Sequence, residues 1–221
     1  MLRKFPAVIA IVVAISGAVT QVSAAEAISR GGIRLTVAPP TSQGAHDAAA
    51  PVRSDLQTIY STFGPDSPAW DAWIGWSLQT DSQTAAAMAF TPQADFNVHE
   101  IRLALTNIEG SEKSTVTLHA DANGIPGQLL AKFKLMTMPE FGKCCATRAV
   151  SSEEGIPISA GQTYWVAAHV PRIWGMADSA WNWTTLEILE HPMAVRRDGA
   201  WHATNDWASA FAVYGKPAAS R

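Results

Sequence analysis

The 221-residue chain is mildly acidic, with 16 Lys and Arg residues against 19 Asp and Glu residues. Because phosphate binding needs clustered cations, this balance argues against a nucleic-acid partner. With 48% hydrophobic residues and only two cysteines, the chain can bury a core without relying on a disulfide framework.

The N-terminus has the pattern of a secretory signal peptide over residues 1–24. Arg3 and Lys4 precede an apolar run, and Ala24 ends a set of small residues of the kind that signal peptidase reads. The run is about 15 residues long, which is shorter than the roughly 20 that a transmembrane helix needs. We therefore expect cleavage near Ala24, no membrane span in the mature chain, and a secreted or periplasmic bacterial protein. Without Arg3 and Lys4 its balance becomes 14 basic against 19 acidic residues, a net charge of about -5.

Composition divides the remainder into a leader and one domain. Residues 25–55 are rich in Ala, Pro and Gly, and they predict a disordered leader with a short strand at Ile33–Val37. Residues 56–215 are expected to form a single β-sandwich domain, and residues 216–221 form a C-terminal tail.

Alternation of apolar and polar residues dominates the predicted domain, and each alternating stretch indicates a strand with one buried face. Leu129, Ala131, Phe133 and Leu135, for example, are expected to face the core together. No convincing amphipathic helix interrupts the pattern, so we predict an all-β chain of about ten strands in an antiparallel, jelly-roll-like β-sandwich. The expected strands are Thr58–Phe63, Trp73–Leu78, Ala85–Phe90, Ile101–Thr106, Thr115–Ala120, Leu129–Leu135, Arg148–Ser151, Tyr164–Val170, Trp181–Leu189, Met193–Arg197 and Ser209–Tyr214.

The stretch LHADANGIPGQLL, residues 118–130, can be interpreted as a calcium loop or as a hairpin turn. A calcium loop that starts at Asp121 would place Lys132 at its twelfth position, where an acidic ligand is required. A hairpin uses the turn residues between two alternating strands, and these are Asp121, Asn123, Gly124, Pro126 and Gly127. We therefore predict a hairpin here and no metal or cofactor site, although a structural calcium ion elsewhere stays an open alternative.

Several segments together resemble the secreted bacterial β-sandwich proteins called choice-of-anchor R domain proteins, which are often found with a PEP-CTERM sorting signal. They are YSTFGP (60–65), AAAMAFTP (85–92), VHEIRLALT (98–106), TVTLHADANGIPGQLL (115–130), CC (144–145), AGQTYWVAA (160–168) and AFAVYG (210–215). The resemblance covers roughly residues 56–215 and implies no established enzymatic activity and no catalytic residues. After Gly215 only KPAASR follows, which lacks the sorting signal, so we expect release rather than anchoring.

Cys144 and Cys145 are the only cysteines, so any internal disulfide must be vicinal. Adjacent Cα atoms lie about 3.8 Å apart, which is closer than a relaxed disulfide prefers. In an oxidising compartment the vicinal bond is the expected state, and free thiols or intermolecular pairing are the alternatives.

Nine tryptophans are a second unusual feature. Trp70, Trp73 and Trp174 lie in turn-rich segments and are candidate ligand contacts, because an indole ring combines a large apolar face with one polar group. Packing beneath loops is the alternative for each of them.

Catalytic motifs are lacking in the sequence. The histidines are scattered, no serine lies in a G-x-S-x-G motif, and His119 and His169 alternate within strands, where exposed or hydrogen-bonded histidines are expected. We therefore predict a non-catalytic module that binds an extracellular polysaccharide, matrix or envelope component. The alternatives are a structural or adhesion module that recognises protein or self, and a hydrolase with carboxylates far apart in sequence.

Overall fold

The computed structural model describes residues 26–30, 33–37, 52–64, 70–79, 84–142, 148–170, 172 and 175–219. Fifteen strands lie within these ranges. No helix in the described part of the chain is long and apolar enough to cross a membrane. The predicted signal peptide, Cys144, Cys145 and Trp174 lie outside the described residues.

The strands form three antiparallel sheets, here named A, B and C. In spatial order, sheet A consists of β1 (Glu26–Arg30), β2 (Ile33–Val37), β4 (Trp70–Gln79), β12 (Ala177–Thr184) and β7 (Leu105–Gly110). Sheet B consists of β10 (Arg148–Ile158), β6 (Phe96–Leu103), β15 (Phe211–Pro217) and β3 (Gln57–Ser61). Sheet C consists of β14 (Ala200–Asp206), β13 (His191–Arg197), β5 (Ala85–Phe90), β11 (Tyr164–His169), β8 (Ser114–Asp121) and β9 (Pro126–Leu135).

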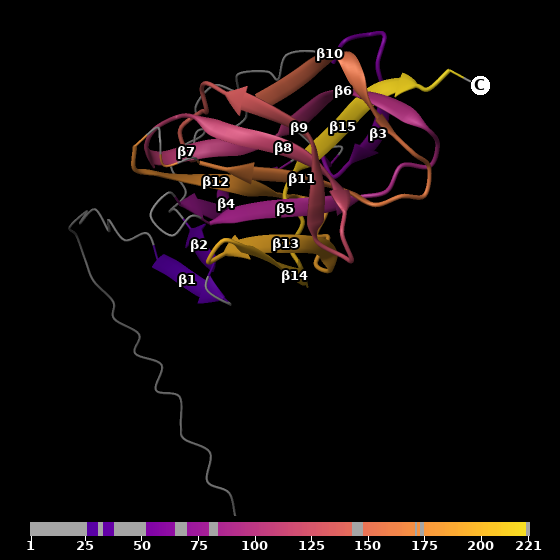
Figure 1. Ribbon diagram of the computed structural model, residues 1–221. Coiled ribbons are helices and arrows are strands. Elements are labelled where there is room, and N and C mark those ends of the chain that lie inside the picture. The colour runs from indigo at the N-terminus through magenta and orange to yellow at the C-terminus, as the bar shows by residue number, and fades with distance from the viewer. Residues whose placement is uncertain are drawn as a thin grey trace, which may run out of the picture.

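Sheets A and B are joined at Ala104, the single residue between β6 and β7. Its amide donates to the Ala210 carbonyl at 3.0 Å, and its carbonyl accepts from the Asn182 amide at 2.9 Å. Sheet C lies against the other two, and Figure 1 shows its strands side by side across one side of the molecule. The prediction of an all-β, antiparallel sandwich is confirmed.

The main core fills the space between sheet C and the other two sheets. Each side contributes large apolar residues that are almost completely buried, which together exclude water from the interior. They include Met88, Val116, Leu118, Val166 and Met193 from sheet C, and Trp76, Leu78, Ile101, Leu103, Trp181 and Phe211 from sheets A and B.

Several strand predictions differ from the structure. The predicted strand Trp181–Leu189 is observed as Ala177–Thr184, and Arg148–Ser151 extends to Ile158. Three other differences have a structural reason. The expected strand Ile101–Thr106 is divided between β6 and β7, because the chain passes from one sheet to the next at Ala104. The edge strand β14 was not expected, because its residues are mostly exposed and give no apolar alternation. In the leader, β2 was expected and β1 was not. β1 pairs with β2, and β2 pairs with β4, so the segment predicted to be disordered adds two strands to sheet A.

The prediction that Leu129 faces the core is wrong. Leu118 pairs with Ala131 but His119 pairs with Leu129, so β9 contains a bulge at this point. A bulge reverses the alternation of the residues beyond it. Leu129 is consequently 50% exposed, whereas Leu130 packs against the core.

The expected polar face of β6 is buried. Arg102 and Glu100 are each 6% exposed and form an ion pair. The guanidinium group of Arg102 lies over the ring of Tyr214 in the neighbouring strand β15. Its central carbon is 5.7 Å from the centroid of the tyrosine ring. Pairing and aromatic contact compensate for the burial of both charges, so this stretch is a structural part of sheet B.

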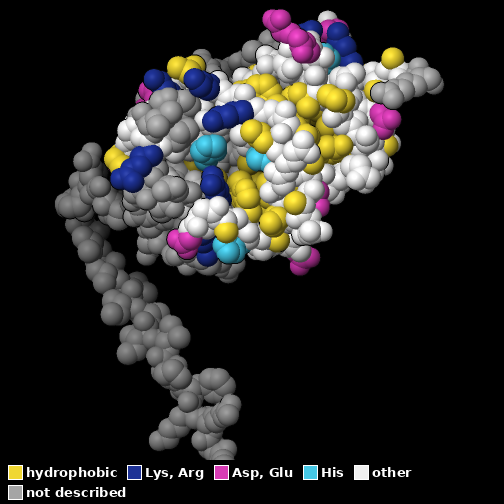
Figure 2. All heavy atoms as spheres, viewed as in Figure 1, with side chains coloured by type: hydrophobic (Ala, Val, Ile, Leu, Met, Phe, Trp, Pro, Cys, Tyr) yellow, Lys and Arg dark blue, Asp and Glu magenta, His cyan; other side chains and the backbone are white. Residues whose placement is uncertain are grey.

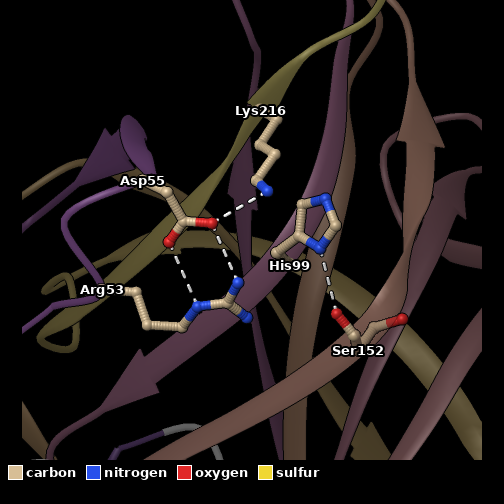
Figure 3. A network of polar contacts seen from close by, with 5 residues as sticks. All are labelled: Arg53, Asp55, His99, Ser152 and Lys216. Atoms are coloured by element: carbon tan, nitrogen blue, oxygen red, sulfur yellow. Dashed lines mark hydrogen bonds and ion pairs between the residues drawn. The ribbon is translucent and has the colours of Figure 1, made fainter.

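Two sets of polar contacts hold the edges of sheet B (Figure 3). Asp55, which precedes β3, accepts from Arg53 Nη2 at 2.9 Å and from Lys216 Nζ of β15 at 2.8 Å. These bonds lower the pKa of Asp55 to about 2. In the second set, His99 Nδ1 lies 3.1 Å from the Ser152 carbonyl oxygen, where β10 departs from regular pairing with β6.

Close packing of β15 against β6 gives a first testable prediction. A Cβ atom on Gly215 would lie 2.1 Å from the carbonyl oxygen of Asn97, so Gly215→Ala must displace one of the two strands. Because the overlap is with backbone, we expect this variant to lose about 3 kcal/mol of unfolding free energy in urea titrations.

The matched control is Gly199→Ala at the β13–β14 turn. Gly199 has φ of +80° and a Cβ atom there would meet nothing within 4 Å, so only backbone strain of about 1 kcal/mol applies. Equal stability of the two variants would contradict the proposed strand contact.

Candidate functional site

The hairpin between β8 and β9 forms one end of sheet C. Asn123 and Gly124 at its tip have φ of +59° and +83°, and the Gly124 amide donates to both carboxylate oxygens of Asp121 at 3.1 Å. The Ala122 amide donates to the Ile125 carbonyl at 2.8 Å, which closes the turn. The carboxylate of Asp121 is therefore fixed in place beside β11.

Asp121 in turn positions Trp165 of β11. The Trp165 indole Nε1–H donates to Asp121 Oδ1 at 2.7 Å, and its ring packs on a floor of small side chains that face away from the main core. This second apolar cluster is made by Ala87, Ala89, Trp165, Ala167 and Ala194, with Ile125 and Trp201 packed at its margin. Sheet C thus carries apolar packing on both faces, and the outer face is built on alanines.

A cavity of about 620 Å³ opens beside Trp165, at the end of sheet C where β5 and β8 end and β11 and β13 begin. This volume is in the range of small-ligand sites in proteins. Six segments line the cavity, contributing Tyr60, Ala89, Phe90, Thr91, Gln93, Asp121, Gly124, Thr163, Trp165, His191, Pro192, Met193, Ala203, Thr204 and Asn205.

The cavity combines aromatic rings with unoccupied hydrogen-bonding groups. Gln93, Thr204 and Asn205 are exposed, and their side chains make no hydrogen bond to another described residue. Thr91 and Thr163 are already paired through their hydroxyl groups at 3.3 Å. A ligand at this site would therefore meet amide and hydroxyl groups at the rim and rings deeper in.

His191 lies at the inner wall of the cavity. It is 5% exposed, and its Nε2 atom makes no hydrogen bond within the described part of the chain. Burial lowers the pKa of His191, and a hydrogen bond to the backbone of Ala89 acts in the opposite direction. The ring is therefore neutral at physiological pH, and its unpaired Nε2 atom is itself buried.

The remaining outer face of sheet C continues from the cavity along the strands. Directly paired residues on neighbouring strands share one face of a sheet, so the register identifies a row that crosses it. The first row is Lys134, Thr115, His169, Ala85, Arg196 and Trp201, and the second is Lys132, Thr117, Ala167, Ala87, Ala194 and Ala203. These two rows are named the outer rows below.

His119 and His169 lie on this outer face, but their environments differ. His119 is hydrogen-bonded through both ring nitrogens, to the Gly127 carbonyl at 3.0 Å and to Thr117 Oγ1 at 2.9 Å. Burial lowers the pKa of His169 to about 4, and the positive charges of Arg196 and Lys132 add to this shift. His119 is hydrogen-bonded, as expected for a histidine within a strand. His169 instead lies near the positively charged side chains of Arg196 and Lys132.

The described residues do not bring together a set of catalytic groups. No group of three or more His, Cys, Asp or Glu side chains among them could hold a metal ion. In the cavity, the Asp121 carboxylate is occupied by the Trp165 indole and by the Gly124 amide. The arrangement is suited to holding a ligand by hydrogen bonds and apolar contact.

The tryptophans predicted as ligand contacts do not form this site. Trp70 is 6% exposed and packs edge-on against Phe63 at 5.5 Å between ring centroids, so packing replaces its expected role as a surface contact. Trp73 lies in β4, but its side chain, like all of Trp174, is outside what the structure describes.

Sequence reasoning missed the residues that form the cavity. Ala203, Thr204 and Asn205 belong to β14, which no apolar pattern indicated. One signal was present in the two alanine-rich segments AAAMAF and YWVAA, where small residues at every second position are typical of strands packed on both faces.

The low pKa of His169 predicts a pH dependence of stability. As pH falls from about 6.5 toward 4, the unfolded chain takes up a proton at this residue that the folded chain does not, so the unfolding free energy decreases. In His169→Gln this contribution is absent, and urea titrations at several pH values should show a shallower decrease over that range.

His191 also has a lowered pKa, so some pH dependence should remain in that variant. His202→Gln, which removes an exposed histidine of β14, is the matched control. If both variants show the same slope as the unmodified protein, the environment assigned to His169 is incorrect.

Comparison with known proteins gives little beyond the fold. No family model and no curated protein matches the chain. The chain is similar in structure to the solved cysteine protease and lectin-like domains of Cwp84, a surface layer associated protein of Clostridium difficile, with a TM-score of 0.50 and 10% sequence identity. The match covers 76% of this chain and 37% of that chain. At this identity the similarity supports the β-sandwich fold alone.

Proposed function

We propose that the protein is a secreted, non-catalytic binding module that holds an extracellular glycan in the cavity at the end of sheet C. The observation that carries this proposal is the composition of the cavity of about 620 Å³, in which aromatic rings lie beside hydrogen-bonding side chains that have no partner among the described residues. Sugars present both apolar ring faces and hydroxyl groups, so a site of this kind matches them on both counts.

The individual groups fit such a ligand. The amides of Gln93 and Asn205 can each donate and accept, which suits hydroxyl groups that also do both. Tyr60 is half-buried and packs against the buried Phe90 with 5.9 Å between ring centroids, so the Tyr60 ring is held in place as an apolar wall of the cavity.

Two further considerations support a location outside the cytoplasm. The N-terminal sequence predicts export, and the structural neighbour includes the lectin-like domain of a surface layer associated protein. Membership of the choice-of-anchor R group, which the sequence resembles, stays part of the proposal. On this account, the ligand is a polysaccharide or another envelope component.

The alternative of an adhesion module that pairs through an edge strand has less support. β9 is one edge of sheet C, and it carries the exposed side chains of Lys132 and Lys134. Charged residues on edge strands, lysine above all, oppose the addition of a further strand. A binding role for the face of the sheet therefore agrees better with the residues present.

Ala203→Trp tests the proposed site, because Ala203 is exposed at the cavity wall and a large side chain there would occupy the space. The purified protein is first screened against neutral and acidic glycans, and the best ligand is then titrated by calorimetry. We expect Ala203→Trp to weaken binding at least tenfold while the melting temperature stays within a few degrees.

The matched control is Ala149→Trp, which places the same side chain at an exposed position of β10 in sheet B. It should bind as the unmodified protein does. A panel without any saturable binding, or equal loss in both variants, would contradict the cavity as the glycan site.

A further inference from the structure

The outer rows of sheet C bring cations from two strands to one face. Lys132 and Lys134 come from β9 and Arg196 from β13, and the pairing register places all three on the same face. His169 of β11, whose low pKa keeps it neutral, lies between them. Four strand spacings separate β9 from β13, which corresponds to ~19 Å between their backbones. The cations therefore lie on either side of the central strands of the sheet.

No carboxylate occupies any of the twelve positions in the two outer rows. Lys132 and Lys134 are exposed and form no ion pair within the described residues, and Arg196 reaches only the Gly199 carbonyl at 3.4 Å. Figure 2 shows Lys, Arg and His side chains gathered over one part of this face, with Asp and Glu side chains toward its rim. The chain as a whole is acidic, so this excess of positive charge is a local feature of the face.

Small side chains lie on the outer face between these cations. Ala87, Ala167 and Ala194 are completely buried although they face outward, because they pack in a cluster with Trp165, Ile125 and Trp201. Beside them, the buried hydroxyl group of Thr115 has no hydrogen-bond partner among the described residues. Cations that are spread along a sheet face, with no carboxylate between them, suit an extended anionic chain better than a compact ion.

We infer that the outer rows bind the anionic groups of an acidic polysaccharide, such as uronate carboxylates or sulfate esters, whose chain continues into the cavity. This inference rests on the proposed glycan-binding function and specifies the class of glycan. The first outer row lies about four residues from the strand positions at the cavity, which corresponds to ~13 Å along the strands. One extended oligosaccharide therefore reaches both regions.

The environment of His169 supports an anionic ligand. Burial is the largest cause of the low pKa of His169, and the charges of Arg196 and Lys132 add to it, so both charges act on the same region of the surface. An anion placed there would offset these positive charges. A neutral glycan would gain nothing from them, so acidic and neutral polysaccharides should be distinguished at this surface.

The test compares the protein with a double variant, Lys132→Gln/Arg196→Gln. Both positions are exposed, so the variant should fold normally, as its melting curve will show. Calorimetry with polygalacturonate, dextran sulfate and unmodified dextran is carried out at low and at moderate salt. We expect an acidic polymer to bind more tightly than dextran, to weaken as salt increases, and to bind the double variant about tenfold less tightly.

The matched control is Arg53→Gln/Lys216→Gln, which removes two cations beside sheet B and so changes the net charge equally. It should retain binding, since only local charge matters on this account. Equal weakening in both double variants would assign the effect to net charge and would overturn the inference. Equal or tighter binding of duplex DNA under the same conditions would do the same, because it would show a general polyanion surface.

The outcomes separate this inference from the proposed function. If a neutral glycan binds and Ala203→Trp abolishes its binding, but acidic polymers have no advantage, the cavity proposal stands and the inference about the outer rows fails. If neither neutral nor acidic glycans bind, both fail. Acidic binding that is lost in Lys132→Gln/Arg196→Gln and weakened in Ala203→Trp supports both.

Discussion

Small side chains in the centre of sheet C are the constraint on which the rest of the binding surface depends. All six residues of β5 are buried, and alternate alanines face the main core and the outer face. Because alanine occupies little space, the indole of Trp165 can lie against the outer face and reach Asp121. Larger residues at Ala87 or Ala167 would displace the indole and with it the wall of the cavity.

The position of the cavity follows from the antiparallel order of the strands. Where β5 and β8 end, β11 and β13 begin, so the ends of four strands and the adjoining turns meet at one end of sheet C. Backbone groups within the sheet are paired, whereas side chains at these ends are free to face a ligand. The same arrangement places the outer rows and the cavity on one continuous surface.

The fold could largely be predicted from the sequence, because alternation directly reflects burial of one face. AAAMAF predicted β5 with its correct bounds, and residues 164–170 predicted β11 to within one residue. The bulge that exposes Leu129 could not be predicted, since one inserted residue changes the facing of the chain without changing its composition.

The site was much harder to predict, because its residues are ordinary ones brought together by register. Lys132, His169 and Arg196 are 37 and 27 residues apart in sequence, and only strand pairing places them on one face. The tryptophans were a more visible signal of a binding site in the sequence. Trp70, however, is buried by packing, and Trp165 is buried against alanines. Residue type alone therefore indicated a binding role without locating it.

The most direct test of the account follows the indole Nε1–H resonances by NMR while a glycan from the binding screen is added. Trp165 donates to Asp121 at the cavity, whereas Trp181 donates to the Ala210 carbonyl in the core and serves as an internal reference. The account predicts a saturable shift of the Trp165 resonance with Trp181 unchanged. Saturable binding that leaves Trp165 unmoved would place the ligand elsewhere and contradict the central claim.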